Sequence, residues 1–325
     1  MVSIPTMLAA TALAAVGAPV LAPLAVVWDL ARLKVKLPTL RLYGFVLQYL
    51  LNDSVEILLA PVLWVAAGFG HRLAGTASIA RHERLQKWSL RLLTERADRL
   101  LGLRVEIDEQ SRKALVGGPV IVVSRHASVF DASLAGVLYE GEDMAVRGVV
   151  MAEMLADPGF DLIYGRLGSV FVRRDDGEAA RVGVSRMTAN AADNTAYVIF
   201  PEGRLSGTSV RDRALEKLAQ TSPGRHERLE SLTHLLPPRP GGFLALLEAL
   251  PHADVIVLGH EGFAAYPALK DLARSVPLEE PIPVTVQRIC RAEIPQDVEQ
   301  QIVWLDELWL ALDANQGLST VAPEG

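Results

Sequence analysis

The sequence contains a single cysteine, Cys290, among its 325 residues. One cysteine excludes an internal disulfide and any metal cluster built from several thiolates. Cys290 ends the apolar, β-prone run PVTVQRIC, so we expect a buried core residue rather than a nucleophile. The histidines show no spacing typical of a metal site, and the sequence has neither a Walker loop nor a dinucleotide-binding glycine loop. We therefore expect no metal and no cofactor.

Basic residues are too few for a protein that binds nucleic acid. Lys and Arg total 32 against 38 Asp and Glu, which gives a formal net charge of -6. Proteins that bind nucleic acid through its phosphates carry an excess of basic residues, so we expect no nucleic-acid partner. Half of the residues are hydrophobic, which is enough to build the core of one large domain or two ordinary ones.

The amino-terminal region lacks charge. Residues 7–28, MLAATALAAVGAPVLAPLAVVW, contain no charged side chain and are about long enough to cross the hydrocarbon core of a bilayer. No Lys or Arg occurs before Arg32, whereas a cleaved secretory signal normally begins with basic residues. A second apolar stretch, 57–70, is about half the length of a spanning helix, but the residues before it can extend it into a partly amphipathic segment.

Basic residues flank both apolar stretches, and they favour the cytoplasmic side of a membrane or a surface of anionic lipid. We therefore predict that residues 1–84 form a helical membrane anchor, as a hairpin or an interfacial segment, with the following domain on the cytoplasmic face. The alternative is that these residues form buried helices of a soluble protein. The flanking basic residues are Arg32, Lys34, Lys36, Arg41, Arg72, Arg81, Arg84 and Lys87.

From about residue 85 the sequence changes to short β-prone runs that alternate with helical ones, which is typical of an α/β domain. We predict a twisted, mostly parallel sheet flanked by helices over residues 85–325. Residues 205–240 are polar and end in prolines, which favours a helical insertion or cap, and a final helix is expected over 297–315. The predicted strands are LRVEI, PVIVVS, RGVVMA, GSVFV, AYVIF, ADVIVLG and IPVTVQRIC.

His126 and Asp131 follow the predicted strand PVIVVS, with four residues between them. On one unbroken helix they would point about 140° apart and could not touch. If the strand ends near Arg125 and a helix begins near Ser128, His126 lies on the turn and Asp131 in the first helical turn. The carboxylate would then accept the Nδ1 proton of His126, and Nε2 could act as a general base. The alternative is a surface histidine beside a helix-capping aspartate.

Polar groups follow other predicted strands as well. The segment FPEGR after AYVIF contains Gly203, which permits close backbone approach, and Arg204, whose guanidinium fits phosphate oxygens. Because the carboxyl ends of parallel strands form the ligand crevice of α/β sheets, such segments can converge. The alternative for the segment FPEGR is an ordinary turn formed by Pro and Gly, with a solvated Arg. For His260 and Glu261, whose side chains point to opposite faces of an extended segment, we expect a head-group or structural role.

The segments RHASVFD, GSVFVRR and FPEGR, in this order after an apolar amino terminus, resemble the 1-acylglycerol-3-phosphate acyltransferase family of glycerolipid acyltransferases. The resemblance covers roughly residues 85–263. It implies that His126 and Asp131 are the catalytic HxxxxD pair. A later segment, LLPPRPGGF, resembles the lysophosphatidylinositol and lysocardiolipin acyltransferase branch. The substrate-binding residues that the first resemblance implies are Arg174, Glu202, Gly203 and Arg204, and the second segment adds Arg239. Arg173, where the family usually has an acidic residue, is a further candidate because it adds positive charge at the end of the strand GSVFV.

The resemblance to this family implies that the protein is a membrane-bound O-acyltransferase. It would move a fatty acyl group from acyl-CoA or acyl carrier protein, as co-substrate, to the free hydroxyl of a lysophospholipid such as 1-acylglycerol-3-phosphate. Two alternatives stay open. One is a thioesterase or lipid hydrolase, for which no GxSxG nucleophile segment is present. The other is a non-catalytic, membrane-bound phospholipid-binding protein.

Overall fold

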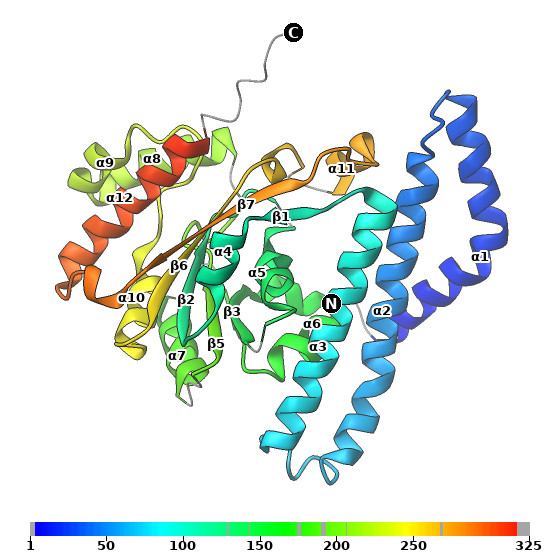
Figure 1. Ribbon diagram of the computed structural model, residues 1–325, viewed down its shortest axis with the longest axis horizontal. Helices are drawn as coiled ribbons and strands as arrows, with labels where there is room; N and C mark the ends of the chain where they lie inside the picture. Colours follow the sequence, from blue (N-terminus) through cyan, green and yellow to red (C-terminus); the bar gives the residue numbers. More distant parts are fainter. Residues whose placement is uncertain are drawn as a thin grey trace.

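The computed structural model describes residues 4–316 except 129, 143, 174–176, 190–192, 206 and 267–268. It contains a seven-stranded sheet with helices on both faces and a long helical hairpin at one side (Figure 1). This is the α/β architecture that the sequence predicts. All seven predicted strands form, so the alternating apolar runs are a sound guide to the sheet. The strands are β1 Val105–Ile107, β2 Val120–Ser124, β3 Ala145–Met151, β4 Val170–Val172, β5 Thr195–Ile199, β6 Asp254–His260 and β7 Ile282–Ile289.

The strands lie in the order β1-β7-β6-β2-β5-β3-β4. Every pairing is parallel except that of β6 with β7. β2 is completely buried and lies in the centre of the sheet, which explains its uninterrupted apolar sequence. Consequently the turn after β2 is flanked by the ends of two parallel neighbours, β5 and β6.

Two hydrophobic cores cover the two faces of the sheet, because alternate residues of each strand point to opposite sides. Ile121 and Val123 face a core completed by Phe243 on α10 and Trp309 on α12. Val120 and Val122 face the other core, which α5 closes with Leu134 and Leu138. The helices of this part are α4 Glu109–Leu115, α5 Asp131–Tyr139, α6 Pro158–Phe160, α7 Gly177–Thr188, α8 Thr208–Thr221, α9 Pro223–Leu229, α10 Pro240–Ala249, α11 Leu269–Ser275 and α12 Val298–Gln316.

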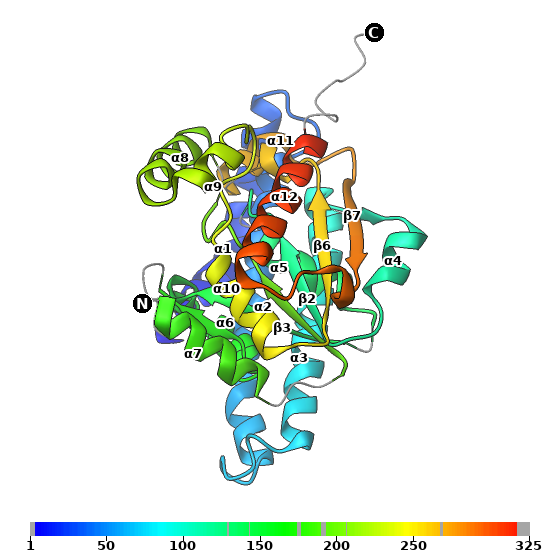
Figure 2. The same cartoon turned by 90° about the vertical axis from the view of Figure 1, so that its left-hand side faces the viewer.

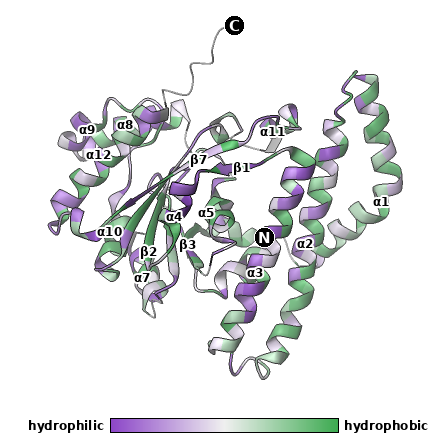
Figure 3. Cartoon of the chain, in the orientation of Figure 1, coloured by the Kyte–Doolittle hydropathy of each residue, from purple (hydrophilic) through white to green (hydrophobic). Residues whose placement is uncertain are grey.

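The amino-terminal hairpin consists of α1 Ile4–Ala31 and α2 Pro38–Ala66, and α3 Thr76–Arg96 packs between it and the sheet (Figure 1). Both α1 and α2 are long and apolar enough to cross a bilayer by length and composition. α1 is apolar along most of its length (Figure 3), and only 11% of its most apolar window is buried. The buried carboxylate of Asp29 accepts the N–H groups of Thr39 and Leu40, which fixes the turn of the hairpin.

The polar segment 205–240 forms helices α8 and α9, as the sequence predicts, and α9 packs against α12 (Figure 2). Arg225 and Arg228 both contact Asp306, which is fully buried on α12. Asp313 accepts three consecutive backbone N–H groups at residues 233–235. These two carboxylates fasten the insertion to the final helix.

The predicted boundary between residues 84 and 85 falls inside α3, so the helix is continuous across it. The expectation that Cys290 is buried is wrong, because β7 ends at Ile289 and Cys290 is exposed at the start of a short 3-10 turn, Arg291–Glu293. The apolar run therefore extends one residue beyond the strand that it predicts.

Candidate active site

The parallel strands β5, β2 and β6 end at the same edge of the sheet. Val123 pairs with Ile199 on β5, and Ser124 pairs with Leu258 on β6. The residues that follow these pairs therefore leave the sheet side by side. They include His126, Glu202 and His260.

His126 lies on the turn after β2, as predicted. Helix α5 begins at Asp131 rather than near Ser128, so Asp131 still lies in the first helical turn. The Nδ1 atom of His126 lies 3.6 Å from Oδ2 of Asp131, and the two side chains are 18% and 0% exposed. The distance exceeds that of a hydrogen bond, as is common for catalytic pairs without substrate. The ring of His126 also packs on Phe200, with 4.7 Å between centroids. One ring nitrogen thus faces the carboxylate while the ring stays accessible.

The Asp131 carboxylate is surrounded by donors at the start of α5. Its Oδ2 accepts the N–H groups of Ala127 at 2.5 Å and Ser128 at 2.8 Å. Its Oδ1 lies 3.1 Å from Nε2 of His260. Burial acts to raise the pKa of Asp131, but its contacts with His126 and His260 and the N–H of Ser128 lower that pKa to about 2. Asp131 is therefore ionised at neutral pH.

The segment FPEGR contributes to this site through the buried Glu202. Its Oε1 accepts the backbone N–H of His126 at 2.7 Å, and its Oε2 accepts that of Leu236 at 3.1 Å. Burial raises the pKa of Glu202 to about 7, although both N–H groups act in the opposite direction. The carboxylate points into the protein, so its direct effect is to fix the backbone that carries His126.

Gly203 has a φ of +65°, a conformation that favours glycine. Its N–H donates to the carbonyl of Phe200, which closes a tight turn. Arg204 follows on this turn and is half-buried, and Arg239 is bound to it because its N–H donates to the carbonyl of Pro201. A Cβ added at Gly203 would lie 3.5 Å from Cδ of Arg239. Arg239 is therefore brought next to the FPEGR turn, 35 positions away in sequence (239 − 204).

The two arginines after β4 are less closely associated with this edge. Arg173 is exposed directly after β4, which is the edge strand and lies two strands from β5. Arg174 lies outside the described residues. Among the predicted site residues, the structure thus brings His126, Asp131, Glu202, Gly203, Arg204 and Arg239 together around the ends of β2 and β5.

The contacts of His260 and Arg125 in the candidate active site were not predicted from the sequence. His260 is fully buried, and its ring contacts Phe263 edge-on with 5.0 Å between centroids, which supports the structural role among the two expected for it. Arg125 is also buried, and its Nη1 donates to the carbonyl of His260 at 3.3 Å. The position of β6 beside β2 creates both contacts, and the order of strands cannot be read from the sequence.

Comparison with protein-family models gives a match to the family described as Acyltransferase over residues 102–267. This chain belongs to the acyltransferase family. Its fold also matches the crystal structure of the 1-acyl-sn-glycerophosphate acyltransferase PlsC from Thermotoga maritima, with a TM-score of 0.47, 15% identity, and coverage of 82% of this chain and 98% of that chain. Among curated protein sequences, none matches.

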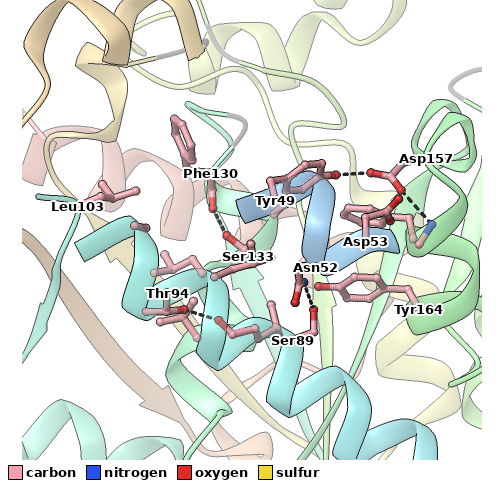
Figure 4. Close-up of a pocket in the computed structure, with 18 of the residues that line it drawn as sticks. Tyr49, Asn52, Asp53, Ser89, Thr94, Leu103, Phe130, Ser133, Asp157 and Tyr164 are labelled. Carbon is pink, nitrogen blue, oxygen red and sulfur yellow. Dashed lines mark hydrogen bonds between the residues drawn. The ribbon is translucent and has the colours of Figure 1, made fainter. Parts of the chain in front are cut away.

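A cavity of about 370 Å³ lies in this acyltransferase between α2, α3 and α5 (Figure 4). Most of its wall is apolar, and one end is polar. Phe130 and Phe263, which line it, stack with 6.3 Å between their centroids, and Phe263 in turn contacts His260. The cavity is lined by Phe130 and Ala132, which flank Asp131 in the sequence, and it reaches α2 of the amino-terminal hairpin. Its polar end consists of Tyr49, Asn52, Asp53, Glu56, Ser89 and Asp157.

Proposed function

We propose that this chain transfers a fatty acyl group from an acyl thioester, acyl-CoA or acyl carrier protein, to the free hydroxyl of a lysophospholipid such as 1-acylglycerol-3-phosphate. Membership in the acyltransferase family supports acyl transfer as the reaction. The observation that carries the mechanism is the His126 ring, which faces an ionised Asp131 through Nδ1 and keeps 18% of its surface exposed.

In this mechanism Asp131 holds His126 in the tautomer with a proton on Nδ1, so Nε2 can accept the proton of the acceptor hydroxyl. The hydroxyl oxygen attacks the thioester carbonyl carbon, and the C–S bond breaks. The departing thiolate takes up the proton from Nε2, which restores neutral His126. A general base of this kind contributes about 10² to 10⁴ in rate.

The acceptor phosphate is assigned to the arginine side of the site. Arg204 and Arg239 lie on neighbouring segments at the FPEGR turn, and guanidinium groups form paired hydrogen bonds with phosphate oxygens. Glu202 supports this arrangement from beneath, because its carboxylate joins the turn of His126 to the segment at Leu236. Arg173 and Arg174 are proposed as outer contacts of the same phosphate.

The hairpin and the cavity give this reaction access to lipid. Exposed apolar side chains on α1 and α2, among them Val16, Val20 and Leu58, suit the interior of a bilayer. Basic residues at the turn of the hairpin favour the cytoplasmic leaflet, and Arg32 lies 4.9 Å above the ring of Trp28, an arrangement suited to a membrane surface. We assign the apolar cavity to a fatty chain that enters from this side.

A transfer assay tests this proposal. The purified protein in detergent is given radiolabelled palmitoyl-CoA and, in separate reactions, lysophosphatidic acid, lysophosphatidylinositol, lysophosphatidylglycerol or no acceptor. We expect labelled phospholipid with at least one acceptor, formed in equal amount to the released thiol. Free fatty acid in place of phospholipid would indicate a hydrolase. The absence of turnover with palmitoyl-CoA and with palmitoyl acyl carrier protein would favour a lipid-binding protein.

A further inference from the structure

His260 is a buried imidazole that the mechanism above does not use. It is the last residue of β6, it is fully buried, and its Nε2 lies 3.1 Å from Oδ1 of Asp131. The opposite oxygen of that carboxylate faces His126 at 3.6 Å and accepts two backbone N–H groups. Asp131 therefore lies between two histidines, one partly exposed and one enclosed.

We propose that His260 is a positioning residue, which holds Asp131 ionised and oriented toward His126. This inference rests on the proposed function for its kinetic consequences. Among the described residues, no hydrogen bond reaches Oδ1 of Asp131, and the group that can donate to it is Nε2 of His260, which lies 3.1 Å away. An ionised oxygen buried without such a partner is costly, so the carboxylate would otherwise rotate or take up a proton.

The surroundings of His260 fix its ring rather than offer it to a substrate. Arg125 donates to its backbone carbonyl, and Phe263 covers one edge of the ring. The charged and titratable groups that the described residues place around His260 and Asp131 are His126 on the β2–α5 turn, Arg125 after β2, Glu202 after β5, Glu261 after β6 and Asp313 on α12. Of these groups, Asp131 is the one whose carboxylate lies within 3.6 Å of both imidazole rings, so we expect a change of the His260 side chain to reach His126 through this carboxylate.

Replacement of His260 by Gln or by Asn distinguishes a positioning role of this residue from a role in filling space. His260→Gln places an amide N–H near the position of Nε2, whereas His260→Asn is too short to reach Asp131. For His260→Asn we expect kcat to fall about 10- to 100-fold, since a small misplacement of a catalytic group has this effect, with KM unchanged. The loss should be greater at pH 5.5 than at pH 8.5, because Asp131 then takes up a proton more easily. His260→Gln should recover most of the rate.

A second measurement is independent of activity. The pKa of Asp131 is low in the folded protein, so its contribution to stability is present above about pH 4 and is lost as the pH falls toward 2. In His260→Asn, acid unfolding in detergent should begin at a higher pH than in His260→Gln. This difference should vanish when both are combined with Asp131→Asn.

Three results would overturn the inference: equal kcat in wild type and His260→Asn, equal impairment of the Gln and Asn variants, or acid unfolding that differs between the variants by the same amount without the Asp131 carboxylate. A wild-type protein with no transferase activity would contradict the proposed function instead. In that case the acid-unfolding comparison still decides whether His260 holds Asp131.

Discussion

Two groups of buried and half-buried carboxylates in this acyltransferase differ in the partners that surround them. Asp131 is met by backbone N–H groups and two imidazoles at the edge of the sheet. At the polar end of the cavity the donors are neutral groups: Tyr49 donates to Asp157 (Figure 4), and Ser89 and Asn52 donate to Glu56. The first group is arranged to hold a negative charge beside a base. The second joins α2 of the hairpin to α3 and α6.

The two groups therefore have different roles: Asp131 supports catalysis, and the polar end of the cavity attaches the hairpin to the rest of the protein. Changes at Asp131 should reduce the rate and leave the hairpin in place. Changes at the polar end of the cavity should loosen the hairpin or alter the fit of a fatty chain while the catalytic pair stays intact. The predictions below test this separation, from the largest expected effect to the smallest.

The largest effect is expected for Asp131→Asn. The amide cannot hold His126 in the tautomer that leaves Nε2 as a base, so kcat should fall about 10² to 10⁴-fold. The variant should also lose the stabilisation of about 2 kcal/mol that the low pKa of Asp131 gives above about pH 4. Steady-state transfer rates and denaturant unfolding between pH 2 and pH 6 measure both effects. Retained activity would show that Asp131 is only a helix cap.

The next largest effects are expected for three arginines, and the structure predicts the order in which their replacement raises KM. Arg204→Ala should raise KM for a phosphorylated acceptor about 10-fold or more, since a hydrogen bond to a charged group contributes about 1.5 to 3 kcal/mol. Arg239→Ala should have a smaller effect, and exposed Arg173→Ala the smallest. A monoacylglycerol, which has no phosphate, serves as the control acceptor and should respond to none of them. The reverse order would move the phosphate site toward β4.

A moderate effect is expected from filling the cavity. Val137 on α5 lines it, so Val137→Trp should shift the preferred acyl thioester to a shorter chain, with kcat for that chain within about threefold of wild type. Val116→Trp, at a position 52% exposed outside the cavity, is the matched control. Competition between thioesters of different chain length measures the shift. An unchanged preference would assign the fatty chain to another surface.

The smallest effect concerns attachment of the hairpin. Tyr49→Phe removes a hydrogen bond between α2 and Asp157, which should lower the free energy of unfolding by about 1 kcal/mol and speed proteolysis between the hairpin and the sheet. Tyr43→Phe is the matched control, because the Tyr43 hydroxyl donates to the carbonyl of Ala14 within the hairpin. Equal proteolysis of both variants would mean that this polar group does not hold the hairpin to the rest of the chain.

Much of the fold could be predicted from sequence because its signals are local. The apolar runs define all seven strands, and the turn between β2 and α5 places Asp131 in the first helical turn. Strand order is not local, so the contact of His260 with Asp131 could not be predicted, nor could the approach of Arg239 to Gly203. The membrane anchor remains a prediction, supported by the length and apolar surface of α1 and α2.

Glu202 illustrates a second limit of prediction from sequence, which concerns the direction of a side chain. The motif FPEGR marks it as important, and the resemblance to glycerolipid acyltransferases implies contact with substrate. In the structure its two oxygens accept backbone N–H groups of His126 and Leu236. A motif shows that a residue belongs to a site but does not show whether its side chain faces the ligand or the protein.

The most direct test of the central claim, that His126 removes the acceptor proton, is phospholipid formation by His126→Ala at saturating acyl thioester and acceptor. The account predicts a loss of about 10² to 10⁴-fold in kcat with unchanged binding of the acceptor and unchanged unfolding at neutral pH. Phospholipid formation at the wild-type rate in this variant would contradict it.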